Sequence, residues 1–237
     1  KVGDHKGLYQ IRGEYDTERV KTSIFAEHFF EDGSGREYNR LIADMIKRGD
    51  FPQKADGRYG IEIELNNKKY INRILYEYIN TKYQSGTGMD YEDGGRDFYY
   101  QNWLYGSWSY IGNIIGNPLF IITEDKNYNI DTSKTHTRFD AQNIGISGNI
   151  CRDISYRINA VFVDYYLSYA VIGYNDTNPL KKIFNNGLRQ NYYLLEIEKK
   201  NILKTPLYTI MQIGYDDGKV KKDVIGGAVT VGTRIQF

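Results

Sequence analysis

The sequence of 237 residues contains one cysteine, Cys151, and three histidines that lie far apart. A single cysteine excludes an internal disulfide framework and a cysteine-based metal cluster. The histidines, His5, His28 and His136, show no paired spacing of the kind that metal ligands need. The sequence also lacks any run of about 18 apolar residues, which excludes a transmembrane helix.

Positive and negative residues are almost equal in number, because there are 31 Lys and Arg residues and 30 Asp and Glu residues. This balance disfavours a nucleic-acid-binding domain that works by bulk electrostatics, since such domains are usually basic. No nucleophile elbow, P-loop or dinucleotide-binding motif is present either. We therefore expect a protein that is not an enzyme, uses no cofactor or metal and binds no nucleic acid.

Aromatic residues, by contrast, are abundant. They make up 15% of the sequence, and tyrosine alone occupies 23 positions. Tyrosine is enriched at membrane boundaries, where its ring lies in hydrocarbon and its hydroxyl meets water. A carbohydrate-binding surface has a similar composition. The mean hydropathy of −0.59 is compatible with a membrane barrel, because half of each spanning strand faces a polar interior.

The most regular alternation of apolar and polar residues lies in the last segment. One set of alternate positions holds Val229, Val231, Thr233, Ile235 and Phe237, and the other holds Ala228, Thr230, Gly232, Arg234 and Gln236. A period of two indicates a β-strand with one apolar face. An arginine that faces lipid at mid-depth costs roughly 2–4 kcal/mol. We therefore expect the valines, Ile235 and Phe237 to face lipid, and Arg234 and Gln236 to face inward.

The same pattern recurs in segments around residues 61–65, 73–78, 154–162, 193–198 and 207–215. Charged residues repeatedly occupy the less apolar side of these segments. The resulting candidates for the lining of a polar lumen are Glu62, Glu64, Arg73, Glu77, Arg157, Glu196 and Arg234. The arginines could attract anions, or they could form ion pairs with the glutamates across the barrel.

The connections between these segments alternate between short and long. Short turns fall near residues 15–18, 66–69, 149–153 and 200–204, and long loops cover about 31–59, 85–135 and 165–189. Short turns at one end and long loops at the other are typical of outer-membrane barrels. The sequence thus predicts one antiparallel β-barrel domain over residues 1–237 with nine or ten strands. A helix is predicted at Arg36–Arg48 in the first long loop.

The loop at 85–120 is the best candidate for ligand binding. The candidate residues are Trp103, Trp108, Tyr99, Tyr100, Tyr105 and Tyr110, together with Arg96, Asp97, Gln101 and Asn102. Aromatic faces cover the C–H faces of sugars, while amides and charged groups bond hydroxyls or acidic groups. The alternative is a folded plug in which these aromatics form a small core, and a plug could also line the binding site.

Two other clusters suggest chemistry only weakly. Glu27 and His28 are adjacent, and neighbours on a strand point to opposite faces, so a hydrogen-bond network at the loop base is favoured over acid–base catalysis. Asp90, Glu92 and Asp93 are rich in oxygen ligands but lack the spacing of an EF-hand calcium loop.

Several of these loop sequences resemble capsule assembly proteins of the Wzi type, in their Bacteroidetes branch. The segments that carry the resemblance are Glu27–Gly35, Tyr76–Gly86, Asp97–Trp103, Ser107–Tyr110 and Ile115–Leu119. The resemblance extends from about residue 7 to the C-terminus. It implies an outer-membrane barrel of about eighteen strands that holds capsular polysaccharide at the cell surface. With nine or ten strands, this chain would be the C-terminal half, and we expect its sheet to remain open.

We therefore predict a barrel protein of the bacterial outer membrane that binds or organises surface polysaccharide. Its partners would be capsular or other surface polysaccharide, outer-membrane lipid and other outer-membrane proteins. Two alternatives are a porin-like solute channel and a structural subunit of a larger outer-membrane complex. An open lumen would favour the channel, and a lumen filled by loops would favour polysaccharide binding.

Overall fold

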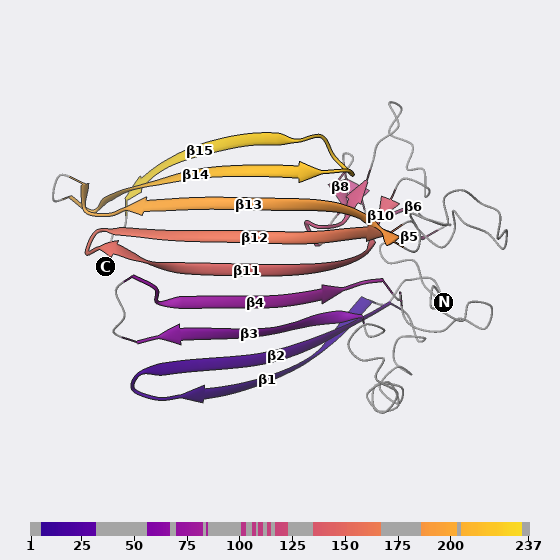
Figure 1. Ribbon diagram of the computed structural model, residues 1–237, viewed down its shortest axis with the longest axis horizontal. Helices are drawn as coiled ribbons and strands as arrows, with labels where there is room; N and C mark the ends of the chain where they lie inside the picture. Colours follow the sequence, from indigo (N-terminus) through magenta and orange to yellow (C-terminus); the bar gives the residue numbers. More distant parts are fainter. Residues whose placement is uncertain are drawn as a thin grey trace.

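The computed structural model describes residues 6–31, 56–66, 70–82, 84, 101–102, 106–107, 109–110, 113–114, 117–122, 135–166, 186–202 and 205–233. Within these residues the protein is all-β, with one antiparallel sheet of nine strands (Figure 1). The sheet consists of β1 (Lys6–Asp16), β2 (Val20–Glu31), β3 (Gly57–Leu65), β4 (Arg73–Asn80), β11 (Arg138–Cys151), β12 (Ile154–Tyr166), β13 (Leu188–Lys199), β14 (Leu207–Gly218) and β15 (Val224–Thr233).

Six two-residue strands lie outside this sheet. They are β5 (Gln101–Asn102), β6 (Gly106–Ser107), β7 (Ser109–Tyr110), β8 (Asn113–Ile114), β9 (Ile121–Ile122) and β10 (Thr135–His136). They pair as β5–β6, β7–β8 and β9–β10. All six belong to the connection between β4 and β11, which the sequence predicted as a long loop.

Each strand of the large sheet pairs with the neighbours that precede and follow it among the nine. Four short turns gather at one end of the sheet, and the long connections lie at the other, together with the five-residue connection between β14 and β15 (Figure 1). The end with the four short turns is the turn end of the sheet, and the opposite end is the loop end. The predicted number of strands and their antiparallel order are confirmed, whereas the predicted helix at Arg36–Arg48 lies outside the described residues.

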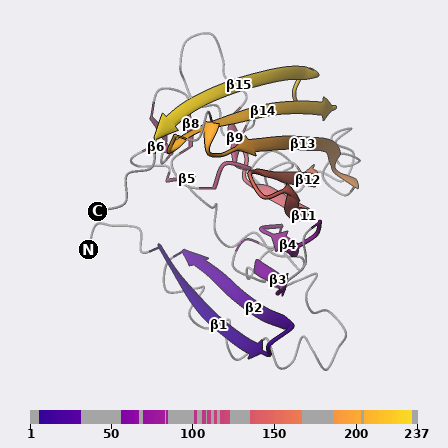
Figure 2. The ribbon, with the colours of Figure 1, turned by 90° about the vertical axis from the view of Figure 1, so that its left-hand side faces the viewer.

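The sheet curves into an open trough (Figure 2). Its edge strands, β1 and β15, do not pair with each other, so the sheet is not closed into a barrel in this chain. The expectation of an open sheet is therefore confirmed. Among the residues that the structure describes, none forms a helix with the length and apolarity that a membrane crossing needs.

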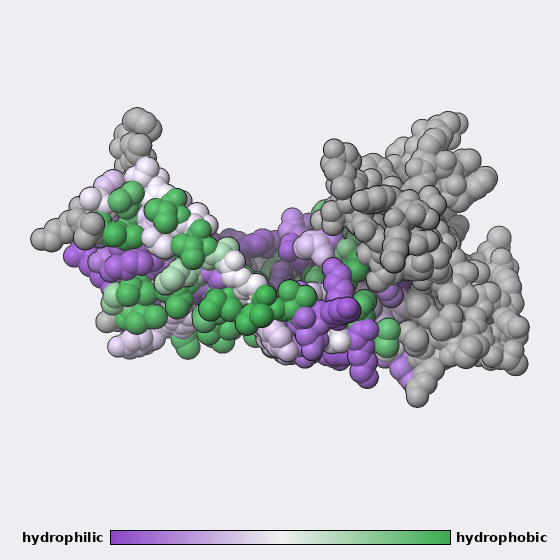
Figure 3. Space-filling model, turned by 90° about the horizontal axis from the view of Figure 1, so that it is seen from above, coloured by the Kyte–Doolittle hydropathy of each residue, from purple (hydrophilic) through white to green (hydrophobic). Residues whose placement is uncertain are grey.

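One face of the sheet is apolar across all nine strands. At its centre, six aliphatic residues on consecutive strands stand opposite one another in register: Ile63, Ile74, Ile146, Ile158, Leu195 and Ile213. This face is exposed; for example, Ile158 is 48% and Ile213 is 55% accessible. Figure 3, which looks onto the β15 side of the sheet, shows apolar side chains running along its flank.

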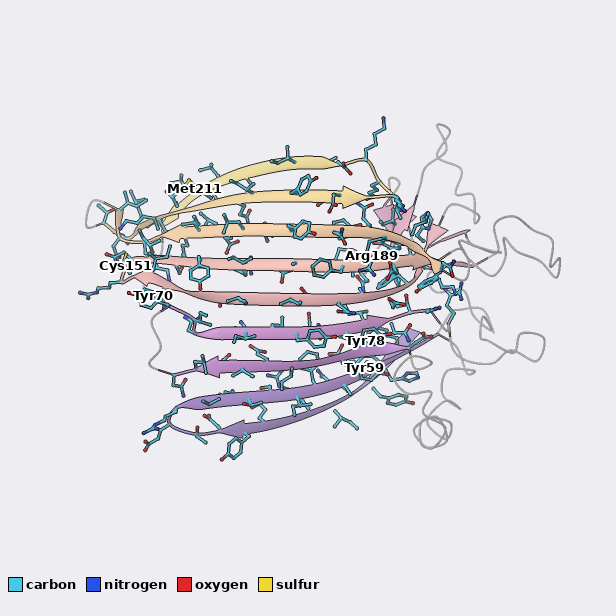
Figure 4. The ribbon with its side chains drawn as sticks, in the orientation of Figure 1. Tyr59, Tyr70, Tyr78, Cys151, Arg189 and Met211 are labelled. Atoms are coloured by element: carbon cyan, nitrogen blue, oxygen red, sulfur yellow. The ribbon has the colours of Figure 1, made fainter. Side chains whose placement is uncertain are left out.

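Aromatic residues border this apolar centre at both ends. Toward the loop end lie Tyr59, Tyr76, Tyr78, Phe162, Tyr193 and Tyr215, and toward the turn end lie Tyr15, Tyr70 and Tyr156. Figure 4 shows Tyr59 and Tyr78 on the loop side and Tyr70 at the opposite end. On this face, none of the described residues between the two aromatic groups is charged.

The register of the last strand agrees with the alternation in its sequence. Val229 and Val231 stand opposite Met211 and Thr209, on the apolar face. Thr230 stands on the other face, opposite Ile210. The remaining residues of the predicted strand, Arg234 to Phe237, lie outside the described residues. Contact of the valines with lipid stays a prediction.

Close packing at the turn end depends on one glycine. The Tyr156 hydroxyl donates a hydrogen bond of 2.8 Å to the carbonyl oxygen of Tyr70. A Cβ on Gly148 would lie 1.7 Å from that same carbonyl oxygen. Since the obstacle is backbone and not a flexible side chain, any side chain at residue 148 would displace the β3–β4 turn.

We predict that Gly148→Ala lowers the free energy of unfolding by about 1–3 kcal/mol, the usual range for overpacking. The matched control is Gly226→Ala, because a Cβ at Gly226 meets no atom within 4 Å. The control should stay within about 0.5 kcal/mol of the parent protein. Urea-induced unfolding of the purified proteins measures both, and equal stability of the two variants would contradict the prediction.

Candidate functional site

The face opposite the apolar one is polar, and it carries the charged residues that the sequence singled out. Glu62, Glu64, Arg73, Glu77, Arg157 and Glu196 all share this face by register. The seventh candidate, Arg234, lies outside the described residues. Segment 117–122 packs against this same face, which is the inside of the trough (Figure 2). That the face lines a lumen stays a prediction.

Arg58 holds the densest part of this polar face together. Its guanidinium donates to both carboxylate oxygens of Glu27, at 2.7 and 2.9 Å, and to Glu77 at 3.2 Å. Glu27 also accepts from Gln10 at 2.9 Å, and Glu77 accepts from Asn143 at 2.6 Å. Both carboxylates are buried, at 8% accessible. Burial of a charge is tolerated only where such pairing and hydrogen bonding satisfy it.

Two further ion pairs continue the network across the sheet. Arg73 on β4 pairs with Glu62 on β3, and Arg157 on β12 pairs with Glu196 on β13 at 2.8 Å. Gln212 adds a hydrogen bond of 2.7 Å to Glu196. Of the two roles considered for the arginines, ion pairing with the neighbouring glutamates is what the structure shows for Arg73 and Arg157. Their side chains still remain 52% and 55% accessible.

A hollow of about 390 Å³ lies between these two ion pairs. Its lining includes Arg73, Leu75, Gly145, Ser147, Arg157, Asn159 and Leu194. A volume of this size falls within the range of small-molecule sites. The lining combines cationic, amide and hydroxyl groups with aliphatic side chains, which are the groups that fix the orientation of a polar ligand.

At the loop end, the same face carries a small apolar core. Phe120 and Ile121 pack against Ile79, Phe139, Ala141, Val163 and Tyr165. The rings of Phe120 and Phe139 meet edge to face at 5.6 Å. The Tyr165 hydroxyl donates a hydrogen bond of 2.8 Å to the carbonyl oxygen of Leu119. Part of the long 85–135 loop is therefore anchored inside the trough.

His136 borders this core and is buried. Its ring meets that of Tyr165 edge to face at 5.9 Å, and its Nδ1 has no hydrogen-bond partner among the described residues. Burial lowers the pKa of the imidazole below its ordinary value. The neutral ring thus adds to the apolar packing and brings no charge into it.

Glu27 and His28 do not form a pair. Glu27 lies on the polar face with Arg58, whereas His28 stands opposite Tyr9 on the other face. His28 is buried, and its Nδ1–H donates a hydrogen bond of 2.7 Å to the carbonyl oxygen of Asp56. The histidine therefore ties the end of β2 to the residue before β3, as a hydrogen-bond network at the loop base would.

Most of the predicted sugar-binding residues lie outside what the structure describes. These are Arg96, Asp97, Tyr99, Tyr100, Trp103, Tyr105 and Trp108. For Gln101, Asn102 and Tyr110 the structure gives only the backbone, in β5 and β7. The oxygen-rich cluster Asp90, Glu92 and Asp93 is also outside, and no group of three metal ligands occurs in the described part.

Sequence reasoning missed Arg58 and the hollow. Arg58 stands in the alternating run that precedes Ile61, so the same period of two could have placed it on the polar face. The hollow had no comparable signal, because it is formed by residues from β4, β11, β12 and β13.

Comparisons with protein-family models, curated proteins and solved structures found no match to this chain.

We predict that Arg58→Ala lowers the free energy of unfolding by about 2 kcal/mol. The change leaves two buried carboxylates without their cation, and removal of one partner of a fully buried pair costs about 3–5 kcal/mol. The partial exposure of Arg58, 38%, reduces that figure. Arg12→Ala is the control, because its pair with Glu14 is exposed on both sides and is worth less than about 1 kcal/mol. Thermal unfolding of both variants compares them, and an equal loss would show that Arg58 has no special role.

Proposed function

We propose that this chain forms part of the wall of a bacterial outer-membrane β-barrel that binds or organises surface polysaccharide. The barrel is a binding protein and not an enzyme in this proposal. The apolar face of the sheet contacts lipid, and the polar face lines the interior.

The observation that carries this proposal is the uncharged, exposed apolar face that spans nine strands between two aromatic groups. Soluble monomers rarely expose continuous apolar patches of more than a few hundred Å². An apolar band between two aromatic girdles is the pattern of a transmembrane barrel surface. The strands have 8 to 14 residues, which brackets the nine to eleven residues that a tilted spanning strand needs.

The distribution of charge supports the same orientation. Charged side chains in mid-strand are confined to the polar face, where Arg58, Arg73 and Arg157 pair with glutamates. A wet interior and ion pairing both stabilise these charges, whereas hydrocarbon would not. Among the residues that the structure describes, no strand pairs with the outer edge of β1 or of β15, and lipid does not tolerate open sheet edges. In this proposal further strands complete the ring.

Polysaccharide binding is favoured over a porin-like channel by what occupies the loop end. Phe120 and Ile121 pack on the inside of the trough, and β5 to β8 lie at the same end (Figure 1). Side chains packed at this end narrow the path for a solute and offer surface to a ligand. The resemblance of the loop segments to Wzi-type capsule assembly proteins points to capsular polysaccharide as that ligand.

We expect Ile213→Arg to impair assembly into the outer membrane. Ile213 is in the aliphatic row at the centre of the apolar face, where a guanidinium in lipid costs roughly 2–4 kcal/mol. Thr230→Arg is the control, since Thr230 is exposed on the polar face of the adjacent strand. Heat-modifiable migration on gels reports assembly in both. Normal assembly of the Ile213 variant would argue against a lipid-facing surface.

Binding of polysaccharide has its own test. We expect Trp103→Ala with Trp108→Ala to reduce surface-bound capsule and to leave barrel assembly intact, because neither residue falls in an alternating segment of the sequence. Loss of one stacking platform would cost on the order of 1–3 kcal/mol. Capsule retention on cells and gel migration are measured together. Full retention of capsule would remove this loop as the sugar site and strengthen the channel alternative.

A further inference from the structure

Arg73 and Arg157 face the same hollow from two sides. They stand on one register row with Ser147 between them, so their Cα atoms are two strand spacings, or about 10 Å, apart. Each guanidinium forms an ion pair with one glutamate on a neighbouring strand, Arg73 with Glu62 and Arg157 with Glu196. Because a guanidinium has five N–H donors, one such pair leaves donors that can be directed to a ligand.

The floor of the hollow stays open because residue 145 is glycine. A Cβ there would lie 3.2 Å from Oδ1 of Asn159 and 3.5 Å from Cβ of Leu75. Leu75, Asn159 and Leu194 stand on the same register row as Gly145. The hollow therefore offers aliphatic contact, an amide and two cationic groups within about 390 Å³.

We propose that this hollow binds an acidic sugar unit, with its carboxylate between the guanidinium groups of Arg73 and Arg157. Arginine matches the planar carboxylate with paired hydrogen bonds, which are among the stronger ones in proteins. Leu75 and Leu194 contact the C–H face of the sugar ring, and Asn159 bonds a hydroxyl. The inference rests on the proposed function. It names the class of polysaccharide that the barrel binds, namely one that contains uronic acids.

The two glutamates that pair with these arginines make the site selective for the ring as well as for the charge of a ligand. Glu62 and Glu196 neutralise the arginines in the empty site, so the hollow has no large net charge that would gather any anion. A ligand must therefore combine a carboxylate with a ring of suitable size. Inorganic sulfate has the charge and lacks the ring, whereas glucose has the ring and lacks the charge.

The experiment measures binding of glucuronate, glucose and inorganic sulfate to the purified full-length protein in detergent by calorimetry. Glucuronate should bind about tenfold or more tightly than either of the others, the difference expected for charge-assisted hydrogen bonds. Equal binding of glucuronate and glucose, or of glucuronate and sulfate, would overturn the proposal.

Two kinds of variant locate the site. The charge-conserving pair Arg157→Gln with Glu196→Gln should reduce glucuronate affinity about tenfold, and Gly145→Ala should reduce it by filling the floor. The control pair, Arg12→Gln with Glu14→Gln, removes an ion pair on the same face outside the hollow and should change nothing. Unchanged glucuronate binding in Arg157→Gln with Glu196→Gln and in Gly145→Ala would refute the assignment. If capsule retention still depends on the tryptophans in that case, only this inference fails and the proposed function stands.

Discussion

Alternation along each strand is the constraint on which the other features depend. Successive side chains of a strand point to opposite faces, and the antiparallel register keeps this alternation in phase over nine strands. A slip of one residue in any pair would move isoleucines into the trough and glutamates onto the apolar face. The uninterrupted aliphatic row from β3 to β14 shows that no such slip occurs.

The apolar face carries no charge in its middle, so the charged side chains in mid-strand lie on the polar face. There they are stabilised by networks of ion pairs and hydrogen bonds. Arg58 serves two carboxylates, and Glu196 accepts from both Arg157 and Gln212. Such cross-strand pairing fixes long side chains that would otherwise be mobile. The result is a wall whose polar groups are preorganised, and preorganised groups bind a ligand with a smaller entropic loss.

Much of this fold could be predicted from the sequence, since a period of two is a local signal. It placed Val229, Val231, Ile158 and Ile213 on one face and Glu62, Arg73 and Glu196 on the other. The pairing of Arg58 with Glu77 and the hollow around Gly145 could not be predicted, because they depend on residues that only the sheet brings together. The packing of Phe120 against Phe139 could not be predicted either, because the sequence of a loop does not specify where the loop packs.

The large sheet that the structure describes has nine strands, and this odd number has a topological consequence. In an antiparallel sheet the first and ninth strands run in the same direction, so β1 and β15 are parallel to each other. In the proposed barrel, two copies of this sheet with the same orientation would meet, β1 against β15, in parallel seams. Bacterial single-chain barrels have an even number of antiparallel strands. In the proposed barrel, a seamless antiparallel ring would therefore need an odd number of further strands that a second copy in the same orientation does not provide.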